Sequence, residues 1–566
     1  MLVDRVRLAV LGATLILTLS LGQAMAVDHT VRQDGTGNFT TIQACVNAAT
    51  SGDSCLVSAG TYDEVVQTVW SGADEANRIV FKAQGMVTIK GFDIKHPYIT
   101  LDGFSITGRT TGYVGYINVE PGGHQCKILN NRIYDPVDHT YYNGEPRLFG
   151  IRFGTSSGQA ANNCVVRGNT ISNLIYIFIS TRGSGHLFEH NTLEYTNSWD
   201  YVYPFGTNIT FRRNVFRRGT VSLSGGNHFD FFQAFGDGYP GPSNNILFEE
   251  NWIQDVEGAF SQLSSSDIKT GTLYDTIGNW TFRRNVVVNV LGNGTLQMPG
   301  IRLEHNTFYR LAYAQNGLGF GGSFTRGDFH GSAIKSNVLL AGGSTPAVAN
   351  GEGGFYSIGL GFRLNREVIG VRVTNDPTVL GDNPGNATTQ GIAASLVANG
   401  YLRNLDGEIG APAKALTSIS QFVLDSQYDA YKTAMYNTLV AAATKDTDAR
   451  ASFAADYNYV AGSAEAGYPA KKTSGCVPGQ TATPFNFCEA HGINGGNPGL
   501  RDLSNPLGPD GLPFTLDDGL KPLPDSPLCG RGEGGTDIGA YSCDPSKVFP
   551  DSVPAPQPPT NLRVVP

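Results

Sequence analysis

The chain has 566 residues, of which 71 are glycine and only 16% are charged. One ordinary globular core rarely reaches this length, so the composition favours a repeat fold that grows along a single axis. The formal net charge is −9 and no basic patch stands out, which excludes nucleic acid as an expected partner.

Residues 1–26 have the pattern of a secretory signal peptide. Arg5 and Arg7 precede an apolar run from Leu8 to Leu21, and Ala24-Met25-Ala26 fits a cleavage site of small residues. The run is short for a membrane span and no second candidate span follows. We therefore expect a secreted monomer without a membrane span. An uncleaved anchor is the alternative.

The mature chain should begin with a cap. Residues 41–49 read as a short amphipathic helix with Thr41 near its N-terminus. The exposed end of a stacked repeat needs such a cover.

A short motif then recurs: alternating apolar residues, an asparagine, and another apolar residue one or two places on. The anchoring asparagines are Asn131, Asn169, Asn191, Asn214, Asn251, Asn285, Asn306 and Asn337, and the shortest gaps between them are 21, 22 and 23 residues. This period indicates a solenoid with one coil of short strands per repeat. An asparagine at a bend tolerates left-handed geometry, and its amide can bond to the asparagines of adjacent coils. Residues 27–345 should form this solenoid.

Eight cysteines in an exported chain favour disulfides. The local pairings that we predict are Cys45–Cys55, Cys476–Cys488 and Cys529–Cys543. Cys126 and Cys164 each lie five residues before an anchor, so they should occupy one position in adjacent coils, about 4.8 Å apart. That distance allows a disulfide, and a stack of two reduced, buried thiols remains equally open.

Three further regions follow in chain order. Residues 346–457 break the repeat and read as an insertion with a helix over 418–443. Residues 458–545 return to coils and a closing segment, and 546–566 form a Pro-rich linker. Asp510, Asp517 and Asp518 could bind Ca²⁺, but they lack EF-hand spacing and a plain turn is favoured.

Three motifs carry a resemblance to a known family. They are Val31 to Gln43, His228-Phe229-Asp230-Phe231-Phe232-Gln233, and Asp537-Ile538-Gly539-Ala540-Tyr541. With the repeat, they resemble the pectate-lyase-like superfamily of secreted β-helix proteins. The resemblance implies an all-β, right-handed parallel β-helix with an N-terminal capping helix and a helical insertion. It also implies an extracellular polysaccharide as partner. Because this fold hosts lyases, hydrolases and esterases, it does not imply one reaction.

A candidate saccharide groove comes from four segments that can be laid over one another. They begin at Asp200, Asp230, Ala259 and Gly294. Strand alternation sends one set of side chains to the core and the other set to a second face. The expected substrate-binding residues on that second face are Tyr201, Tyr203, Phe231, Gln233, Gln262 and Gln297. The alternative is a second internal layer in which the glutamines form a buried amide ladder.

Candidate catalytic residues lie close to this face. Asp200 and Asp230 fall at matching positions of adjacent coils, where they could form a Ca²⁺ site, an acid/base pair, or simple turn caps. His228 could be a general base or a structural histidine. Lys269, in the loop 266–278, could be the base of a lyase with Arg182 as its anion partner, or only a solvated lysine.

The leading hypothesis is a polysaccharide lyase that cleaves a uronic-acid-containing polymer by β-elimination. A glycoside hydrolase that uses the aspartate pair, and a non-catalytic carbohydrate-binding or cell-surface module, are the alternatives.

Overall fold

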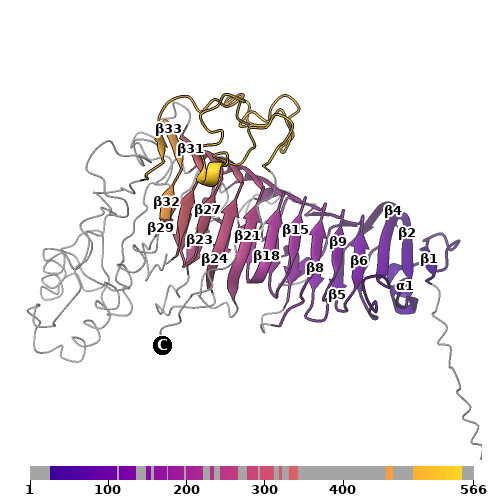
Figure 1. Ribbon diagram of the computed structural model, residues 1–566. Coiled ribbons are helices and arrows are strands. Elements are labelled where there is room, and N and C mark those ends of the chain that lie inside the picture. The colour runs from indigo at the N-terminus through magenta and orange to yellow at the C-terminus, as the bar shows by residue number, and fades with distance from the viewer. Residues whose placement is uncertain are drawn as a thin grey trace, which may run out of the picture.

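The computed structural model describes residues 26–110, 114–135, 148–154, 159–174, 176–196, 199–220, 230–234, 242–264, 277–290, 294–311, 318–320, 331–341, 454–462 and 489–550. Their strands stack side by side in parallel register along one axis (Figure 1). The chain is a parallel β-helix, which confirms the predicted fold class. No helix in these ranges is long and apolar enough to cross a membrane.

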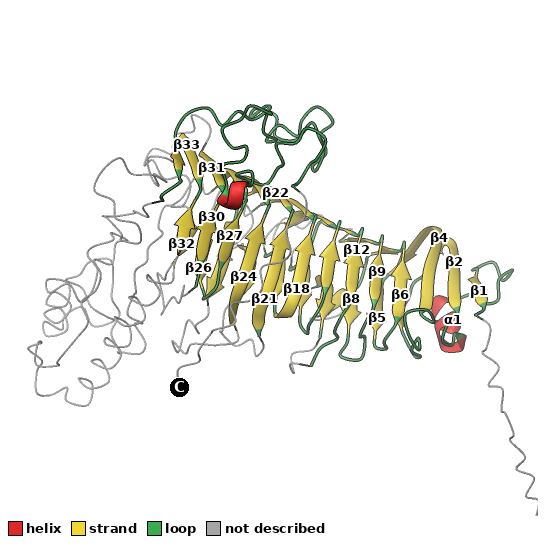
Figure 2. Cartoon of the chain, in the orientation of Figure 1, coloured by secondary structure: helices red, strands yellow, loops and turns green. Residues whose placement is uncertain are grey.

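Each coil contributes up to three short strands, so the strands form three rows (Figure 2). The first row holds β1 (Asp28–Val31), β2 (Ser54–Thr61), β4 (Ile79–Ile89), β6 (Ile99–Asp102), β9 (Lys127–Leu129), β12 (Val165–Arg167), β15 (Leu187–Glu189), β18 (Gly206–Arg212), β21 (Ser243–Glu249), β24 (Ile277–Arg283), β27 (Arg302–Glu304), β30 (Ala333–Lys335) and β32 (Ala454–Asp456). The second row holds β7 (Ser105–Ile106), β10 (Arg132–Tyr134), β13 (Thr170–Ser172), β16 (Thr192–Thr196), β19 (Val215–Gly219), β22 (Trp252–Val256), β25 (Val286–Val290), β28 (Thr307–Leu311), β31 (Val338–Ala341), β33 (Tyr459–Gly462) and β34 (Ile493–Asn494).

The third row is a separate sheet, called sheet B here. It holds β3 (Val65–Gln67), β5 (Gly91–Ile94), β8 (Gly115–Val119), β11 (Phe149–Phe153), β14 (Ile179–Thr181), β17 (Val202–Pro204), β20 (Asp230–Ala234), β23 (Ala259–Ser264), β26 (Gly294–Gln297) and β29 (Leu318–Phe320). The first two rows join into one sheet because β4 runs through their corner and pairs with both β6 and β7.

The predicted asparagine ladder is confirmed at the corner between the first and second rows. Each anchor's carboxamide oxygen accepts hydrogen bonds from the backbone and side-chain N–H groups of the preceding anchor. The bonded series runs through Asn131, Asn169, Asn191, Asn214, Asn251, Asn285, Asn306, Asn337 and Asn458. The buried Glu489 ends the ladder, because its carboxylate accepts both N–H groups of Asn458 at 2.9 and 2.7 Å.

Inside the coils, apolar side chains stack on their counterparts. Phe188, Phe211, Phe248 and Phe282 follow one another at one position of the first row, with ring centroids 4.7, 4.7 and 5.2 Å apart. Parallel register places identical residues above one another, so a single apolar position becomes a continuous column of the core.

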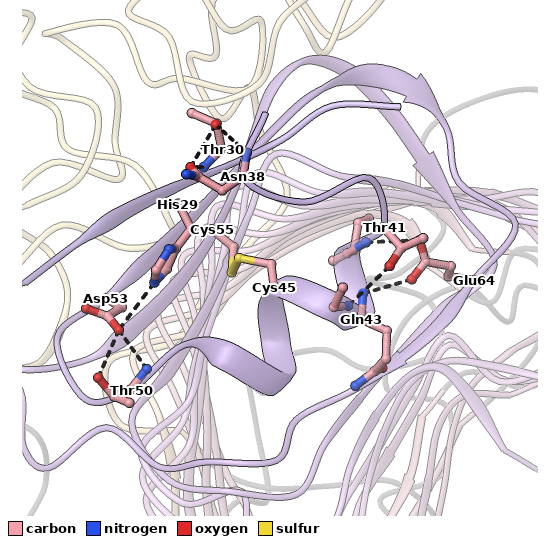
Figure 3. Close-up of a disulfide and its surroundings, with 12 residues drawn as sticks. His29, Thr30, Asn38, Thr41, Gln43, Cys45, Thr50, Asp53, Cys55 and Glu64 are labelled. Carbon is pink, nitrogen blue, oxygen red and sulfur yellow. Dashed lines mark hydrogen bonds and ion pairs between the residues drawn. A yellow bond between two sulfur atoms is a disulfide. The ribbon is translucent and has the colours of Figure 1, made fainter. Parts of the chain in front are cut away.

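The N-terminal end is covered by α1 (Ile42–Ala48), as predicted (Figure 3). Thr41 caps this helix by accepting the N–H of Ala44. Ile42, Cys45 and Val46 are buried, and Cys45 forms the predicted disulfide with Cys55 of β2.

Glu64 provides a second cap for α1, and its loss has a predicted cost. Its carboxylate accepts the N–H groups of Ile42 at 3.0 Å and Gln43 at 2.8 Å (Figure 3). We expect Glu64→Ala to lower the free energy of unfolding by about 1–2 kcal/mol, measured by urea denaturation, because two helix N–H groups lose their acceptor. The control Glu120→Ala removes only a surface ion pair with Lys95 and should cost under about 1 kcal/mol. Equal losses in the two variants would contradict the capping role.

Strand pairing resumes after a long stretch of chain that lies outside the described residues. β32 pairs with β30 and β33 with β31, although residues 342–453 separate β31 from β32 in the sequence. β32 begins slightly before the boundary expected at residue 457. Asn337 therefore bonds to Asn458 across a sequence separation of 121 residues. The helix predicted over 418–443, the Cys476–Cys488 pairing and the signal peptide lie outside the described residues.

Residues 495–550, called the C-terminal segment here, do not continue the strand rows. They fold back along the second row, in gold in Figure 1. Ala540 and Tyr541 are buried against Trp252, Val286 and Val288 of β22 and β25. The segment contains the 3₁₀-helix η4 (Glu533–Gly535) and is closed by the predicted Cys529–Cys543 disulfide. The closing motif thus covers one side of the solenoid.

Internal hydrogen bonds hold the C-terminal segment together. The buried carboxylate of Asp518 accepts the N–H groups of Phe514 and Thr515 and the hydroxyl of Tyr541 at 2.8 Å. The ammonium of Lys521 donates to the carbonyls of Ser542, Asp544 and Lys547. Asp518 therefore stabilises the turn that the sequence predicted here.

Cys126 and Cys164 lie in adjacent coils, as the repeat predicted. Both are buried, and they are not joined by a disulfide. The thiol of Cys164 bonds to the carbonyl of Gly123, and the N–H of Cys126 bonds to Cys164 Sγ at 3.2 Å. Of the two alternatives, the structure shows the stack of reduced thiols.

Candidate functional site

The face of sheet B that points away from the core carries a continuous row of polar residues. Strand pairing places Asp93, Asn118, Arg152, Ser180, Tyr203, Gln233 and Gln262 at one position of consecutive coils. Their neighbours on either side in sequence, such as Ile151, Ile179 and Val202, are buried in the core. Because successive side chains of a strand point to opposite faces, these seven residues lie on the face away from the core. We call them the sheet B polar row.

One arginine belongs to the sheet B polar row, and a second lies on the next coil, two residues beyond the row position. Arg152 lies on β11, and Arg182 directly follows β14. Both are only half-buried, as are Ser180 and Gln262. The Arg152 guanidinium also lies 5.3 Å from the ring centre of Phe149, which restrains its position. This part of the row presents cationic, hydroxyl and amide groups to the outside.

Sequence reasoning identified Arg182 and missed Arg152. A signal was available, because Arg152 sits between Ile151 and Phe153 in an alternating segment. Period-2 alternation with apolar residues on both sides predicts that such an arginine faces away from the core.

An ion pair closes the N-terminal end of the row. Arg109 binds Asp93 through both guanidinium branches, at 2.9 and 3.3 Å, and both side chains are only 7% exposed. The charge of Asp93 is therefore matched within the protein.

The glutamines form part of the predicted amide ladder. Gln233 Nε2 donates to Gln262 Oε1 at 2.7 Å, and Gln233 is only 3% exposed. Gln262 is half-buried. The third predicted member, Gln297, is not aligned with the other two glutamines. Strand pairing places Gln262 opposite Thr295 and Gln297 opposite Ser264. The register between β23 and β26 is offset by two residues from the predicted superposition, and the side chain of Gln297 lies outside the described set.

The prediction that Tyr201 and Phe231 line a substrate-binding face is wrong. Tyr201 and Phe231 are fully buried, and their rings pack on Phe216 of the second row with centroids 6.0 and 4.7 Å apart. The adjacent Phe232 also points inward, onto Phe248. At the corner that leads into sheet B the backbone turns, so strict alternation fails there. Tyr203 lies in the row itself but is 5% exposed.

Asp200 and Asp230 occupy adjacent coils, as predicted, and both are buried. Asp200 Oδ1 accepts the N–H of Asp230 at 2.6 Å, so this carboxylate caps the next coil. Ca²⁺ needs six to eight oxygen ligands. Among the described residues, no third Asp, Glu, His or Cys ligand completes a group with these two. A Ca²⁺ site at this pair stays a prediction, and we derive no step through Ca²⁺.

Two of the predicted catalytic residues cannot be placed. His228 and Lys269 lie outside the described residues, and of the loop predicted over 266–278 only Ile277 and Gly278 are described, as the start of β24. Both predicted catalytic residues flank strands of sheet B, since 221–229 precedes β20 and 265–276 follows β23. Their roles as general bases remain predictions.

The arrangement as a whole suits an extended, hydroxylated and acidic ligand. Stacked coils repeat polar groups about every 4.8 Å, so a polymer that runs along the axis meets a similar group at each step. Guanidinium groups bind carboxylates through two parallel hydrogen bonds.

No family model matches the chain, and no curated protein matches it. Among solved structures, the PL6 family polysaccharide lyase from Pseudopedobacter saltans is 14% identical, with a TM-score of 0.35, over 57% of this chain and 89% of that one. A mannuronic acid specific family 6 lyase from human gut microbiota is 13% identical, with a TM-score of 0.35, over 57% and 71%. The pectin methylesterase from Aspergillus niger is 11% identical, with a TM-score of 0.28, over 56% and 84%. Likenesses this distant say nothing about the reaction.

Proposed function

We propose that this chain is a secreted polysaccharide lyase that cleaves a uronic-acid-containing polymer bound along sheet B. The observation that carries the proposal is the pair Arg152 and Arg182, half-buried on the solvent side of adjacent coils. The two disulfides support export, because such bonds persist in oxidising compartments.

The chemistry of β-elimination explains why arginines matter. A base removes the proton α to the uronate carboxylate, and negative charge then grows on the carboxylate oxygens. A fixed guanidinium stabilises that charge without having to reorganise. The electron pair next forms the ring double bond as the bond between the β carbon and the glycosidic oxygen breaks, and that oxygen takes up a proton from a general acid or from water. Arg182 would bind the carboxylate of the reacting sugar, and Arg152 that of its neighbour. His228 or Lys269 would supply the base.

The direct test is a screen of the secreted protein against acidic and neutral polysaccharides, with and without EDTA. A lyase leaves an unsaturated, ultraviolet-absorbing sugar at each cut. Reducing ends without that absorbance would identify a glycoside hydrolase instead. Ligand-dependent stabilisation without any cleavage would identify a binding module. Loss of cleavage with EDTA would bring a metal ion back into the mechanism.

A further inference from the structure

A second site lies at the corner between the first and second rows, away from sheet B. The residue before each ladder asparagine has a positive φ and points its side chain outward; we call this series the corner file. It includes Gly168, His190, Arg213, Glu250, Arg284, His305 and Ser336, with φ between 53° and 69°. Left-handed backbone is costly for residues other than glycine, and Gly168 shows that glycine is accepted here. The presence of larger side chains at these strained positions therefore needs an explanation.

Part of that explanation is the C-terminal segment. It lies along the corner file at the later coils, where Ser336 Oγ accepts the N–H of Glu533 at 3.0 Å and His305 Nδ1 contacts the carbonyl of Asp537 at 3.0 Å. At the earlier coils the segment meets the file at Phe549, whose ring centre lies 5.8 Å from the Arg213 guanidinium. A pocket of about 570 Å³ opens there, lined by His190, Arg213, Glu250, Phe514, Lys547, Val548, Phe549 and Pro550.

The charged groups of this corner pocket favour an anion. Glu250 is 6% exposed, and its carboxylate pairs with Arg213 at 2.7 Å and with Arg284 at 3.7 Å. Among the lining residues, the two cations Arg213 and Lys547 outnumber the single carboxylate of Glu250, and Arg284 is not part of the lining. This excess of cationic lining residues, on a chain of net charge −9, favours an acidic ligand.

Two phenyl rings supply an apolar wall. Phe514 and Phe549 have centroids 5.8 Å apart, and both are only half-buried. Phe549 is held in place by Tyr541, with ring planes 9° from parallel, and by the Arg213 guanidinium 5.8 Å from its centre. Such rings can pack against the C–H face of a sugar, while nearby cations bind its acidic group.

We propose that the corner pocket binds a carboxylate-bearing sugar, a uronic acid residue, as a second carbohydrate site remote from the sheet B polar row. The rings Phe514 and Phe549 would contact the C–H face, and Arg213 and Lys547 the carboxylate. The choice of sugar rests on the proposed function, whereas the test measures binding and not turnover.

The test is saturation-transfer NMR on the full secreted protein with sodium glucuronate and sodium galacturonate, compared with glucose, galactose and sodium acetate. Uronates should bind in preference to the neutral sugars and to acetate. Lys547→Gln and Phe549→Leu should each weaken uronate binding by about tenfold, which is the loss expected for one charge-assisted contact or one ring. The matched control is Arg218→Gln. Like Arg213 of the pocket, Arg218 is exposed, has a positive φ (61°) and pairs with a glutamate, Glu194. It lies outside the pocket.

Each contrary result has one meaning. Neutral sugars that bind as tightly as uronates overturn the acidic class, and acetate that binds as tightly overturns the role of the rings. Uronate binding that is equal in all variants, or absent from the wild type, overturns the site. If uronates bind here while no polysaccharide is cleaved, the proposed function fails and the pocket stands.

Discussion

Replacement of Arg182 by glutamine should lower kcat/KM on the cleaved uronate polymer by about 10²–10³-fold, the loss typical of removing one group that stabilises transition-state charge. Glutamine keeps the polar character and much of the length but loses the charge and the paired N–H groups. The measurement is the initial rate of appearance of the unsaturated product. The effect should fall mainly on kcat, because the carboxylate gains charge as the proton leaves.

Two further variants isolate the role of Arg182. Arg152→Gln should raise KM more than it lowers kcat, since a neighbouring sugar is bound equally in the ground and transition states. Arg132→Gln is the control, because Arg132 is exposed on β10 in the second row and contacts only the ring of Tyr134 among the described contacts. Unchanged turnover in Arg182→Gln, with the melting temperature also unchanged, would remove sheet B from the mechanism.

Loss of one ladder asparagine should be the most damaging single change to stability. Asn251 is 1% exposed, and its side chain accepts two hydrogen bonds from Asn214 and donates one each to Phe211 and Asn285. Asn251→Ala leaves these buried partners unsatisfied, at about 1–3 kcal/mol for each group. We expect a loss of about 3–5 kcal/mol after relaxation.

Urea denaturation followed by tryptophan fluorescence can measure this loss locally. Trp252 directly follows Asn251, and Trp280 lies in the next coil; both are fully buried. Because stacked repeats can unfold in parts, the midpoint and the slope should both be compared. Asn244→Ala on β21 is the matched control, since its carboxamide accepts one bond of 3.4 Å from Asn279. It should cost under about 1 kcal/mol. A similar loss of unfolding free energy in both variants would mean that the asparagine ladder contributes no more to stability than Asn244 does.

The ladder also explains how the fold tolerates loops of unequal length. Intervals between bonded anchors range from 21 residues, between Asn285 and Asn306, to 121, between Asn337 and Asn458. Each anchor binds the next through backbone and side chain in the same way, so the coil is set by local contacts and not by the length of the excursion. Loop closure costs little for added length.

The sequence by itself determined the architecture. Asparagine at a bend and apolar residues at fixed offsets repeat within each coil, so their pattern needs no knowledge of distant contacts. The same local logic correctly predicted α1, the Cys45–Cys55 and Cys529–Cys543 disulfides and the proximity of Cys126 to Cys164.

Only the tertiary structure decided which residues face a ligand. Tyr201 and Phe231 turned inward because alternation holds along a strand and fails at a corner. The two-residue offset of Gln297 arose between strands joined by a long connection, where the repeat sets no register. Strand pairing places Arg152 opposite Ser180, on the coil that also carries Arg182. The C-terminal segment, which has no repeat, lines a pocket together with Arg213 and Glu250. The repeat pattern determines the local fold of each coil. A binding site depends in addition on how the coils pair and on which segments cover them.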